Sequence, residues 1–259
     1  MLLTIDCGNT NVVFALYDGQ ALRGVWRCKT DAARTADEYL AFISQHFQLT
    51  AVSLRDVADV IISSVVPDTN FSLTGFCQKG FGIKPLFIGP DISADQIGIK
   101  VLIDRPQELG ADRIVNAVAI RDYYKHDAIV VDFGTATTID VIGGDGAFRG
   151  GIIAPGVNLS MAALHAAAAK LPKINVARPP KVIGTNTVEA MQSGVFYGYA
   201  GLVDGLITRI CGEFGSSPKV IATGGLAPLF REILPVISTI DEELTLKGLL
   251  SIYHSVKNL

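Results

Sequence analysis

The chain opens with Leu2-Leu3-Thr4-Ile5-Asp6-Cys7-Gly8-Asn9-Thr10, an apolar run that ends at a carboxylate and leads into a glycine turn. A short apolar run bounded by turn residues predicts a β-strand. A comparable stretch, Ala128-Ile129-Val130-Val131-Asp132-Phe133-Gly134-Thr135, recurs halfway along the chain. The two stretches share a pattern rather than a close sequence match. The repeat therefore predicts two halves that are built alike.

Each of these strands is followed by further strand signals. In the first half, Asn11–Tyr17 and Leu22–Lys29 flank the hairpin signal Asp18-Gly19, which predicts a three-stranded meander. The second half repeats this order. The expected strands are Thr137–Ile142 and Phe148–Ile153, and the turn between them is Gly143–Gly146.

Helical periodicity alternates with the strands that follow. Thr35 to Phe47 carries apolar residues on one helical face, and Val57 to Val66 is a β-branched run that stops at Pro67. The second half continues with a helical pattern at Val188–Ile210 and a short strand at Val220–Ala222. A helix at Thr245–His254 is expected to end the chain. This alternation predicts an α/β protein in which each half is a mixed sheet with flanking helices. We place the boundary between residues 1–115 and 116–259.

The pattern from Val188 to Ile210 is unusual because its apolar stripe is wide and leaves little polar face. A helix of this kind is buried in its own domain or against a partner chain. We expect the second case, a homodimer with the substrate site near its interface.

The composition describes a folded protein with a large interior. Of the 259 residues, 49% are hydrophobic and 18% are charged, whereas globular domains usually carry about 25% charged residues. This much apolar surface offsets chain entropy and excludes intrinsic disorder. The net charge is −3, and no basic cluster occurs. We therefore expect no nucleic-acid partner.

Cysteine spacing and the lack of long apolar runs indicate the compartment. No uninterrupted apolar run reaches the roughly 18 residues of a membrane span, and the first residues lack the pattern of a signal peptide. The sequence therefore predicts a cytoplasmic protein with no membrane partner and with reduced thiols. The scattered histidines do not favour a zinc site. The cysteines concerned are Cys7, Cys28, Cys77 and Cys211.

The pattern Asp6-x-Gly8-x-Thr10 suits an anion. A glycine turn allows close approach and unusual φ/ψ angles, and it presents backbone N–H groups and a hydroxyl. The carboxylate would repel a bare phosphate, so the pattern needs an intervening cation, typically Mg²⁺. Taken alone, the pattern is more typical of an ordinary strand end with a turn. Its recurrence at Asp132 favours two hairpins that clamp a polyphosphate from both sides.

With both patterns present, the sequence resembles the superfamily of acetate and sugar kinases, chaperone ATPases and actin. That resemblance implies two similar actin-like, ribonuclease H-like halves. It also implies that Thr223-Gly224-Gly225 fills the place of a Gly-Gly element that lies against adenosine. A turn that leads into a helix explains Gly224-Gly225 equally well.

Further motifs narrow the resemblance to one family. Together with the two Asp-x-Gly patterns, they make the sequence similar to type III pantothenate kinases from residue 6 to about residue 225. These motifs are Gly110-Ala111-Asp112-Arg113, Gly150-Gly151-Ile152-Ile153-Ala154-Pro155-Gly156 and Gly184-Thr185-Asn186-Thr187. One position departs from the family: Ile103 stands where many members carry a substrate-binding Tyr.

The resemblance implies a role for each matching residue. Asp112 is the proton acceptor, Asp132 binds a monovalent cation (K⁺ or NH₄⁺), and Asp6 binds Mg²⁺ directly or through water. Residues implied to bind ATP are Asp6, Cys7, Gly8, Asn9, Thr10, Asn11, Val12, Val13 and Thr135. Residues implied to bind pantothenate are Gly110, Ala111, Asp112, Arg113 and Thr187.

The chemistry of two residues fits these roles. Arg113 offers a fork of donors suited to a carboxylate, and an ionised Asp112, favoured at a helix N-terminus, can accept a hydroxyl proton. The competing interpretation of both is simple capping and a solvated charge. The resemblance implies ATP-dependent phosphorylation of pantothenate to 4′-phosphopantothenate. The alternatives are a non-catalytic regulator on the same scaffold and a kinase for another small molecule.

Overall fold

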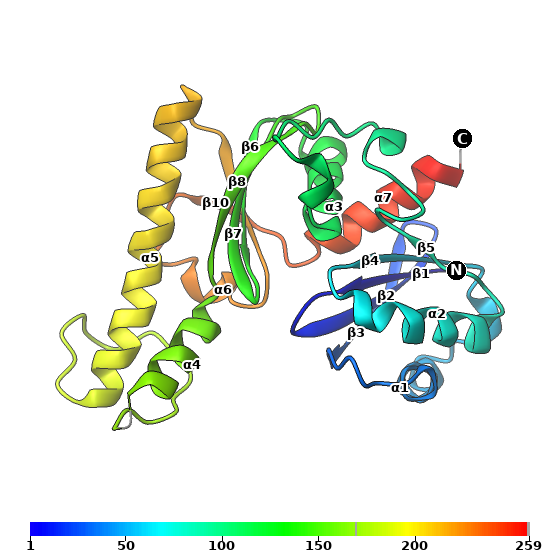
Figure 1. The fold of residues 1–259 in the computed structure, drawn as a ribbon, viewed down its shortest axis with the longest axis horizontal. Coiled ribbons are helices and arrows are strands. Elements are labelled where there is room, and N and C mark those ends of the chain that lie inside the picture. The colour runs from blue at the N-terminus through cyan, green and yellow to red at the C-terminus, as the bar shows by residue number, and fades with distance from the viewer. Residues whose placement is uncertain (169, 258–259) are drawn as a thin grey trace. The chain divides into compact units, whose positions relative to one another are not determined.

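The computed structural model describes residues 1–168 and 170–257 (Figure 1). The chain forms two compact units. The first contains Met1–Tyr124, Gly146–Phe148 and the segment that begins at Leu244, and the second contains Lys125–Asp145 and Arg149–Glu243. We expected the boundary between the two halves after residue 115, but this residue lies within a helix. The C-terminal helix, expected in the second half, belongs to the first unit.

The first unit is built on a five-stranded sheet of order β3-β2-β1-β4-β5. Strands β1 to β3 form the expected antiparallel meander, and β4 pairs with β1 in parallel. Gly19, in the expected hairpin turn, has a φ of 60°, which suits glycine. The strands are β1 (Leu2–Cys7), β2 (Asn11–Asp18), β3 (Ala21–Lys29), β4 (Asp59–Ser64) and β5 (Leu86–Phe87).

The second sheet repeats this topology in the order β8-β7-β6-β9-β10. β6 pairs with β7 in antiparallel register and with β9 in parallel register, as β1 does with β2 and β4. The shared strand order confirms the repeat predicted from the sequence. The strands are β6 (Ala128–Phe133), β7 (Ala136–Ile142), β8 (Phe148–Pro155), β9 (Lys219–Thr223) and β10 (Ile237–Ile240).

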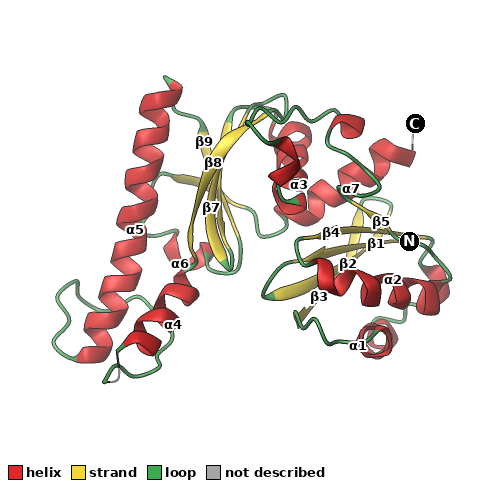
Figure 2. Ribbon diagram, in the orientation of Figure 1, coloured by secondary structure: helices red, strands yellow, loops and turns green. Residues whose placement is uncertain are grey.

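Helices flank both sheets (Figure 2). In the first unit these are α1 (Ala36–Leu49), α2 (Pro67–Phe81), α3 (Ala111–Ala119) and α7 (Leu244–Lys257). A π-helical turn, Ile120–Tyr124, follows α3, and short 3₁₀ turns cover Leu54–Asp56, Asp95–Ile97 and Pro106–Glu108. In the second unit the helices are α4 (Val157–Ala167), α5 (Thr187–Phe214) and α6 (Ala227–Phe230).

Local sequence explains where the first helices begin. The Thr35 hydroxyl accepts a hydrogen bond from the Glu38 N–H, and the Glu38 carboxylate accepts one from the Thr35 N–H. This reciprocal cap satisfies two N–H groups that helix α1 leaves without partners. Pro67, expected to stop a strand, is also the first residue of α2, a position where its missing N–H costs nothing.

Alternation along β1 separates the two faces of the first sheet. Leu3, Ile5 and Cys7 pack in one core cluster with residues of α1 and α2. Successive side chains of a strand point to opposite faces, so Asp6 points to the other face. Helices α3 and α7 pack on that face, against β1 and β4 (Figure 1).

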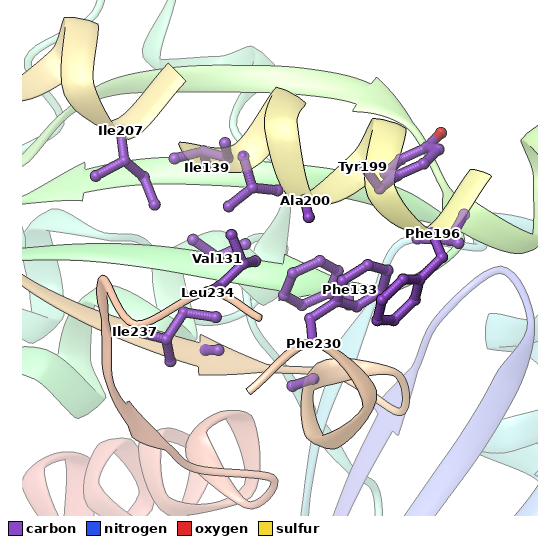
Figure 3. Close-up of a cluster of buried hydrophobic side chains, with 14 of the residues drawn as sticks. Val131, Phe133, Ile139, Phe196, Tyr199, Ala200, Ile207, Phe230, Leu234 and Ile237 are labelled. Carbon is purple, nitrogen blue, oxygen red and sulfur yellow. The ribbon is translucent and has the colours of Figure 1, made fainter. Parts of the chain in front are cut away.

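In the second unit, α5 covers one face of the sheet. Figure 3 shows its side chains, among them Phe196, packing toward Phe133 of β6 and Phe230 of α6. The Phe230 ring stacks on Phe133 and Phe196 with centroid separations of 4.9 and 5.2 Å. Aromatic pairs at such distances add to the burial energy. The helix has 28 residues, and no helix within the described residues is long and apolar enough to cross a membrane.

Candidate active site

The loop after β1 is closed by backbone hydrogen bonds. The Gly8 N–H donates to the Asn11 carbonyl at 3.0 Å, and Thr30 at the end of β3 joins the loop twice: its N–H donates to the Thr10 carbonyl at 2.9 Å and its hydroxyl to the Gly8 carbonyl at 2.6 Å. Gly8 is not among the residues with positive φ. The unusual backbone angles expected at Gly8 are therefore wrong, and a Cβ built there would lie 3.5 Å from the Asn11 carbonyl oxygen.

The side chains of two residues in this segment, Cys7 and Val12, point into the core. The Cys7 and Val12 side chains are fully buried in the core beneath α1 and α2. The Cys7 thiol lies 3.2 Å from the Thr69 hydroxyl, and burial raises the pKa of that thiol. Only the backbone of Cys7 and Val12 is available to a nucleotide.

The N-terminus of α3 lies at the end of the sheet where β1 and β4 finish. A Cβ built on Gly110, the N-cap residue of α3, would lie 3.5 Å from Val65 Cγ1, and the Val65 N–H donates to the Cys7 carbonyl at 3.0 Å. Asp6 pairs in register with Ser63 of β4. The first unit thus brings the Asp6 loop and the Gly110–Arg113 segment to one end and one face of its sheet.

Asp112 sits in the first turn of α3 and is partly buried. Its Oδ1 accepts a hydrogen bond from the Arg113 N–H at 2.8 Å. Desolvation by burial raises the pKa of the Asp112 carboxyl, and this outweighs the Arg113 N–H and guanidinium, which lower it. Burial is therefore the largest influence on this pKa, and it opposes the helix N-terminus, which favours the ionised form.

Arg113 follows directly and is held on an aromatic ring. Its Cζ lies 5.0 Å from the centroid of the Phe148 ring. Phe148, assigned by its sequence pattern to the second half, is fully buried and belongs to the first unit. Sequence reasoning missed this residue, because only a long-range contact brings it beneath α3.

In the second unit, Asp132 holds the place in β6 that Asp6 holds in β1, the fifth of six residues. The turn after it packs on the N-terminus of α4, since a Cβ on Gly156 would overlap the Thr135 carbonyl oxygen. No side chain caps α4. A helix N-terminus with free N–H groups beside a Gly-Thr turn is a favourable setting for phosphate. Sequence reasoning had not found α4, although the Gly150–Gly156 motif leads into it.

Gly224 also packs on this turn. Its φ is 87°, and a Cβ there would lie 2.5 Å from Asp132 Oδ1 and 2.7 Å from the Phe133 carbonyl oxygen. The Gly224 carbonyl accepts the Ala227 N–H at 3.1 Å, which starts α6. Of the two interpretations of Gly224-Gly225, the turn before a helix is confirmed.

Thr187 lies elsewhere in the second unit, exposed in the first turn of α5. The turn is capped by Asn186, whose side chain accepts the Glu189 N–H at 3.0 Å. The first turns of α5 run along α4.

Within residues 1–168 and 170–257, no group of three or more His, Cys, Asp or Glu side chains could hold a metal ion. Lys79 forms a surface ion pair with Asp37 at 2.9 Å. The Arg34 guanidinium lies 5.4 Å from the Tyr39 ring.

Solved structures with the same arrangement define the class of protein. A Campylobacter jejuni protein described as a Baf family transcriptional activator aligns with a TM-score of 0.63 at 22% identity, covering 99% of this chain and 100% of its own. The ROK hexokinase of Thermus thermophilus aligns with a TM-score of 0.52 at 13% identity, covering 100% and 99%. The fold is that of the actin-like ATPases and sugar kinases.

Sequence comparison identifies the family within this class. The profile of type III pantothenate kinase matches residues 2–209. The type III pantothenate kinase of Paramagnetospirillum magneticum is 54% identical over 98% of this chain and 97% of its own length. The chain belongs to the type III pantothenate kinase family. It phosphorylates pantothenate with ATP to give 4′-phosphopantothenate, the first step of coenzyme A biosynthesis.

Proposed function

We propose that Asp112 is the general base that accepts the proton of the pantothenate hydroxyl as this oxygen attacks the γ-phosphorus of ATP. The observation that carries this role is its position: a partly buried carboxylate beside the Asp6 loop, with a pKa raised by desolvation. A raised pKa makes an ionised carboxylate a stronger base. Phosphoryl transfer otherwise depends on positioning and charge neutralisation.

Arg113 and its neighbours would bind pantothenate. The guanidinium offers two parallel N–H donors, which match a carboxylate, and the small residues Gly110 and Ala111 begin α3 directly before it. Thr187 would supply a further contact. An assay of ADP release with pantothenate and a panel of other small alcohols tests this assignment: only pantothenate and its close analogues should support turnover. Equal turnover of unrelated alcohols would contradict it.

The ATP phosphates would be held by two loops. On the first unit this is the segment from Asp6 to Val13, in which Gly8 leaves room for an oxygen near the backbone. On the second unit Thr135 would contact phosphate, next to the uncapped N-terminus of α4. Both loops offer N–H groups and hydroxyls to an anion, which supports the proposal.

Mg²⁺ would be held by Asp6, directly or through water. One carboxylate next to a phosphate-binding loop fits this ion, because Mg²⁺ keeps several waters and usually takes one or two carboxylates plus substrate phosphates. When bound, the ion would neutralise charge on the phosphates. Asp6 would fix its position at the end of β1.

A monovalent cation, K⁺ or NH₄⁺, would lie at Asp132. The donor types fit, because the Asp132 carboxylate and the Phe133 carbonyl oxygen both lie close to the backbone of Gly224, and hard cations take oxygen ligands. The ion would relieve repulsion between the Asp132 carboxylate and phosphate.

The enzyme would act as a homodimer. The groove between α4 and α5, about 520 Å³ in volume, is lined mostly by apolar side chains, including Leu164, Met191 and Leu202. Leu159 on α4 and Val188 on α5 are also exposed, at 53% and 40%. A second copy would cover this apolar surface. Thr187 adjoins it at the start of α5, which supports a substrate site near the interface.

We place the reaction in the cytoplasm. All four cysteines are free thiols, and thiols persist in a reducing compartment.

A further inference from the structure

We propose that Asn116 and Thr245 are positioning residues for the reaction. Their hydrogen bond sets how helix α3 is rotated on helix α7, and the rotation of α3 sets where the Asp112 carboxylate stands. The inference rests on the proposed role of Asp112 as the base. It gives a function to the C-terminal helix, which belongs to the first unit although the residues just before it belong to the second.

Asn116 is a polar side chain in the interior of the first unit, with 2% of its surface exposed. Its Oδ1 accepts a hydrogen bond from the hydroxyl of Thr245, in the first turn of α7, at 2.9 Å. A buried polar group that loses its partner is costly, so this bond favours one fit of the two helices. Apolar contacts are less directional and specify the fit less sharply.

The backbones of the two helices touch next to this bond. A Cβ built on Gly248 of α7 would overlap the Val115 carbonyl oxygen and would lie 2.7 Å from Val115 Cγ1. The helices lie side by side (Figure 1). The glycine therefore holds α7 close to α3, and the bond between Asn116 and Thr245 fixes the rotation of α3 at that separation.

Asp112 lies one helical turn before Asn116. Residues four apart share one side of a helix, and Gly110, the N-cap of α3, provides no side-chain cap. The placement of this first turn therefore follows from the packing of the next. A side-chain tip stands about 5–6 Å from the helix axis, so a rotation of about 10° moves it by about 1 Å. A displacement of about 1 Å can lower a rate by about 10²-fold.

Removal of the Thr245 hydroxyl tests the proposal in the full-length chain. Thr245→Val keeps the shape of the side chain but loses the donor. We expect its kcat to be about 10- to 100-fold lower, with KM for ATP within about 2-fold of wild type. Thr245→Ser keeps the hydroxyl and should retain wild-type kcat. Equal losses in both variants, or a loss in neither, would overturn the proposal.

A double-mutant cycle with Asp112 separates positioning from a general loss of structure. If the hydrogen bond acts through Asp112, Thr245→Val should have no further effect once Asp112→Asn has removed the base. The kcat of the double variant should then match that of Asp112→Asn within about 2-fold. The same loss in both backgrounds would contradict the inference.

The cycle also distinguishes two failures. If Asp112→Asn keeps the wild-type kcat, the role proposed for Asp112 fails, and this inference fails with it. If Asp112→Asn loses kcat and Thr245→Val does not, only the inference about Asn116 and Thr245 fails.

Two further variants show whether stability explains the result. Ser251→Ala removes another hydroxyl of α7, one that hydrogen-bonds to Asp122 in the π-helical turn after α3; it should melt at a lower temperature and keep kcat. Asn116→Leu combined with Thr245→Val replaces both partners and leaves no buried polar group unpaired. This combination should melt close to wild type and still lose kcat as Thr245→Val does. Full kcat in this combination, or an equal loss of kcat in Ser251→Ala, would overturn the proposal.

Discussion

The backbone of Gly224 lies against the carboxylate of Asp132, so closely that a Cβ at Gly224 would come within 2.5 Å of Asp132 Oδ1. Thr223, the residue before Gly224, pairs in register with Asp132 across β9 and β6. The two strands therefore end together, and the turn into α6 begins where the carboxylate stands. This arrangement links a glycine motif near the end of the second unit to the acidic residue at the end of its central strand.

Gly224→Ala should disturb this contact. The new methyl group would meet the Asp132 carboxylate and the Phe133 backbone, at a φ of 87° that side chains rarely adopt. We expect a loss of about 1–3 kcal/mol of stability and a higher K⁺ concentration for half-maximal activity. The matched control is Gly225→Ala, since a Cβ at Gly225 would have nothing within 4 Å. Similar behaviour of both variants in melting and K⁺ titration would refute the prediction.

Activity should depend on a monovalent cation at Asp132. Assays in Tris buffer with K⁺ or NH₄⁺ titrated back should show strong activation, because the cation would offset repulsion between the carboxylate and phosphate. Asp132→Asn should lose most of this response. Asp204→Asn, at an exposed position of α5, should keep it. Equal rates with and without K⁺ would exclude the cation site.

Association should depend on the α4–α5 surface. Leu164→Arg introduces a charge into the apolar groove and should shift the mass measured by light scattering from a dimer to a monomer. Leu49→Arg changes a leucine that is 78% exposed on α1 and should leave the dimer intact. A wild-type protein that is monomeric at micromolar concentration and fully active would contradict the dimer.

The raised pKa of Asp112 gives a signed pH dependence. As a base, Asp112 must be ionised, so kcat/KM should fall as pH drops through its folded-state pKa, which lies above the ordinary value for Asp. The free energy of unfolding should change with pH in the opposite direction: the contribution of Asp112 to it should rise as pH falls. The folded state binds this proton more tightly than the unfolded state, so Asp112 destabilises the fold fully above the raised pKa, and this effect fades as pH falls from there to the ordinary pKa of Asp.

Comparison of melting temperatures across pH tests that sign. At neutral pH, Asp112→Asn should melt at a higher temperature than wild type, because the buried charge is gone. The advantage should shrink as pH falls through the raised pKa. An Asn variant that is less stable than wild type at neutral pH would contradict this sign and indicate that the charge of Asp112 stabilises the N-terminus of α3.

Local sequence predicted the meanders well, because the apolar runs around Asp6 and Asp132 and the Asp18-Gly19 turn report short-range preferences. The domain boundary could not be predicted in this way. Helix α7 joins the first unit through close packing on α3, where a Cβ on Gly248 would overlap the Val115 carbonyl. No pattern among neighbouring residues predicts a contact between two helices that lie so far apart in the sequence.

The candidate site shows the same difference between features that the local sequence predicts and features that depend on tertiary packing. The motifs identified Asp112 and Arg113, whose residue types carry the chemistry. They did not reveal that burial controls the Asp112 carboxyl, nor that Phe148 lies under Arg113. Both properties depend on neighbours supplied by tertiary packing rather than by adjacent residues.

The most direct test of the central claim is kcat of Asp112→Asn, measured by ADP release at saturating ATP and pantothenate. Asparagine keeps the shape of the side chain and its capping ability but cannot accept a proton. If Asp112 is the base, kcat should fall by about 10²-fold or more, while the variant remains folded and binds ATP as wild type does. A folded variant that retains more than about a tenth of wild-type kcat would contradict the account.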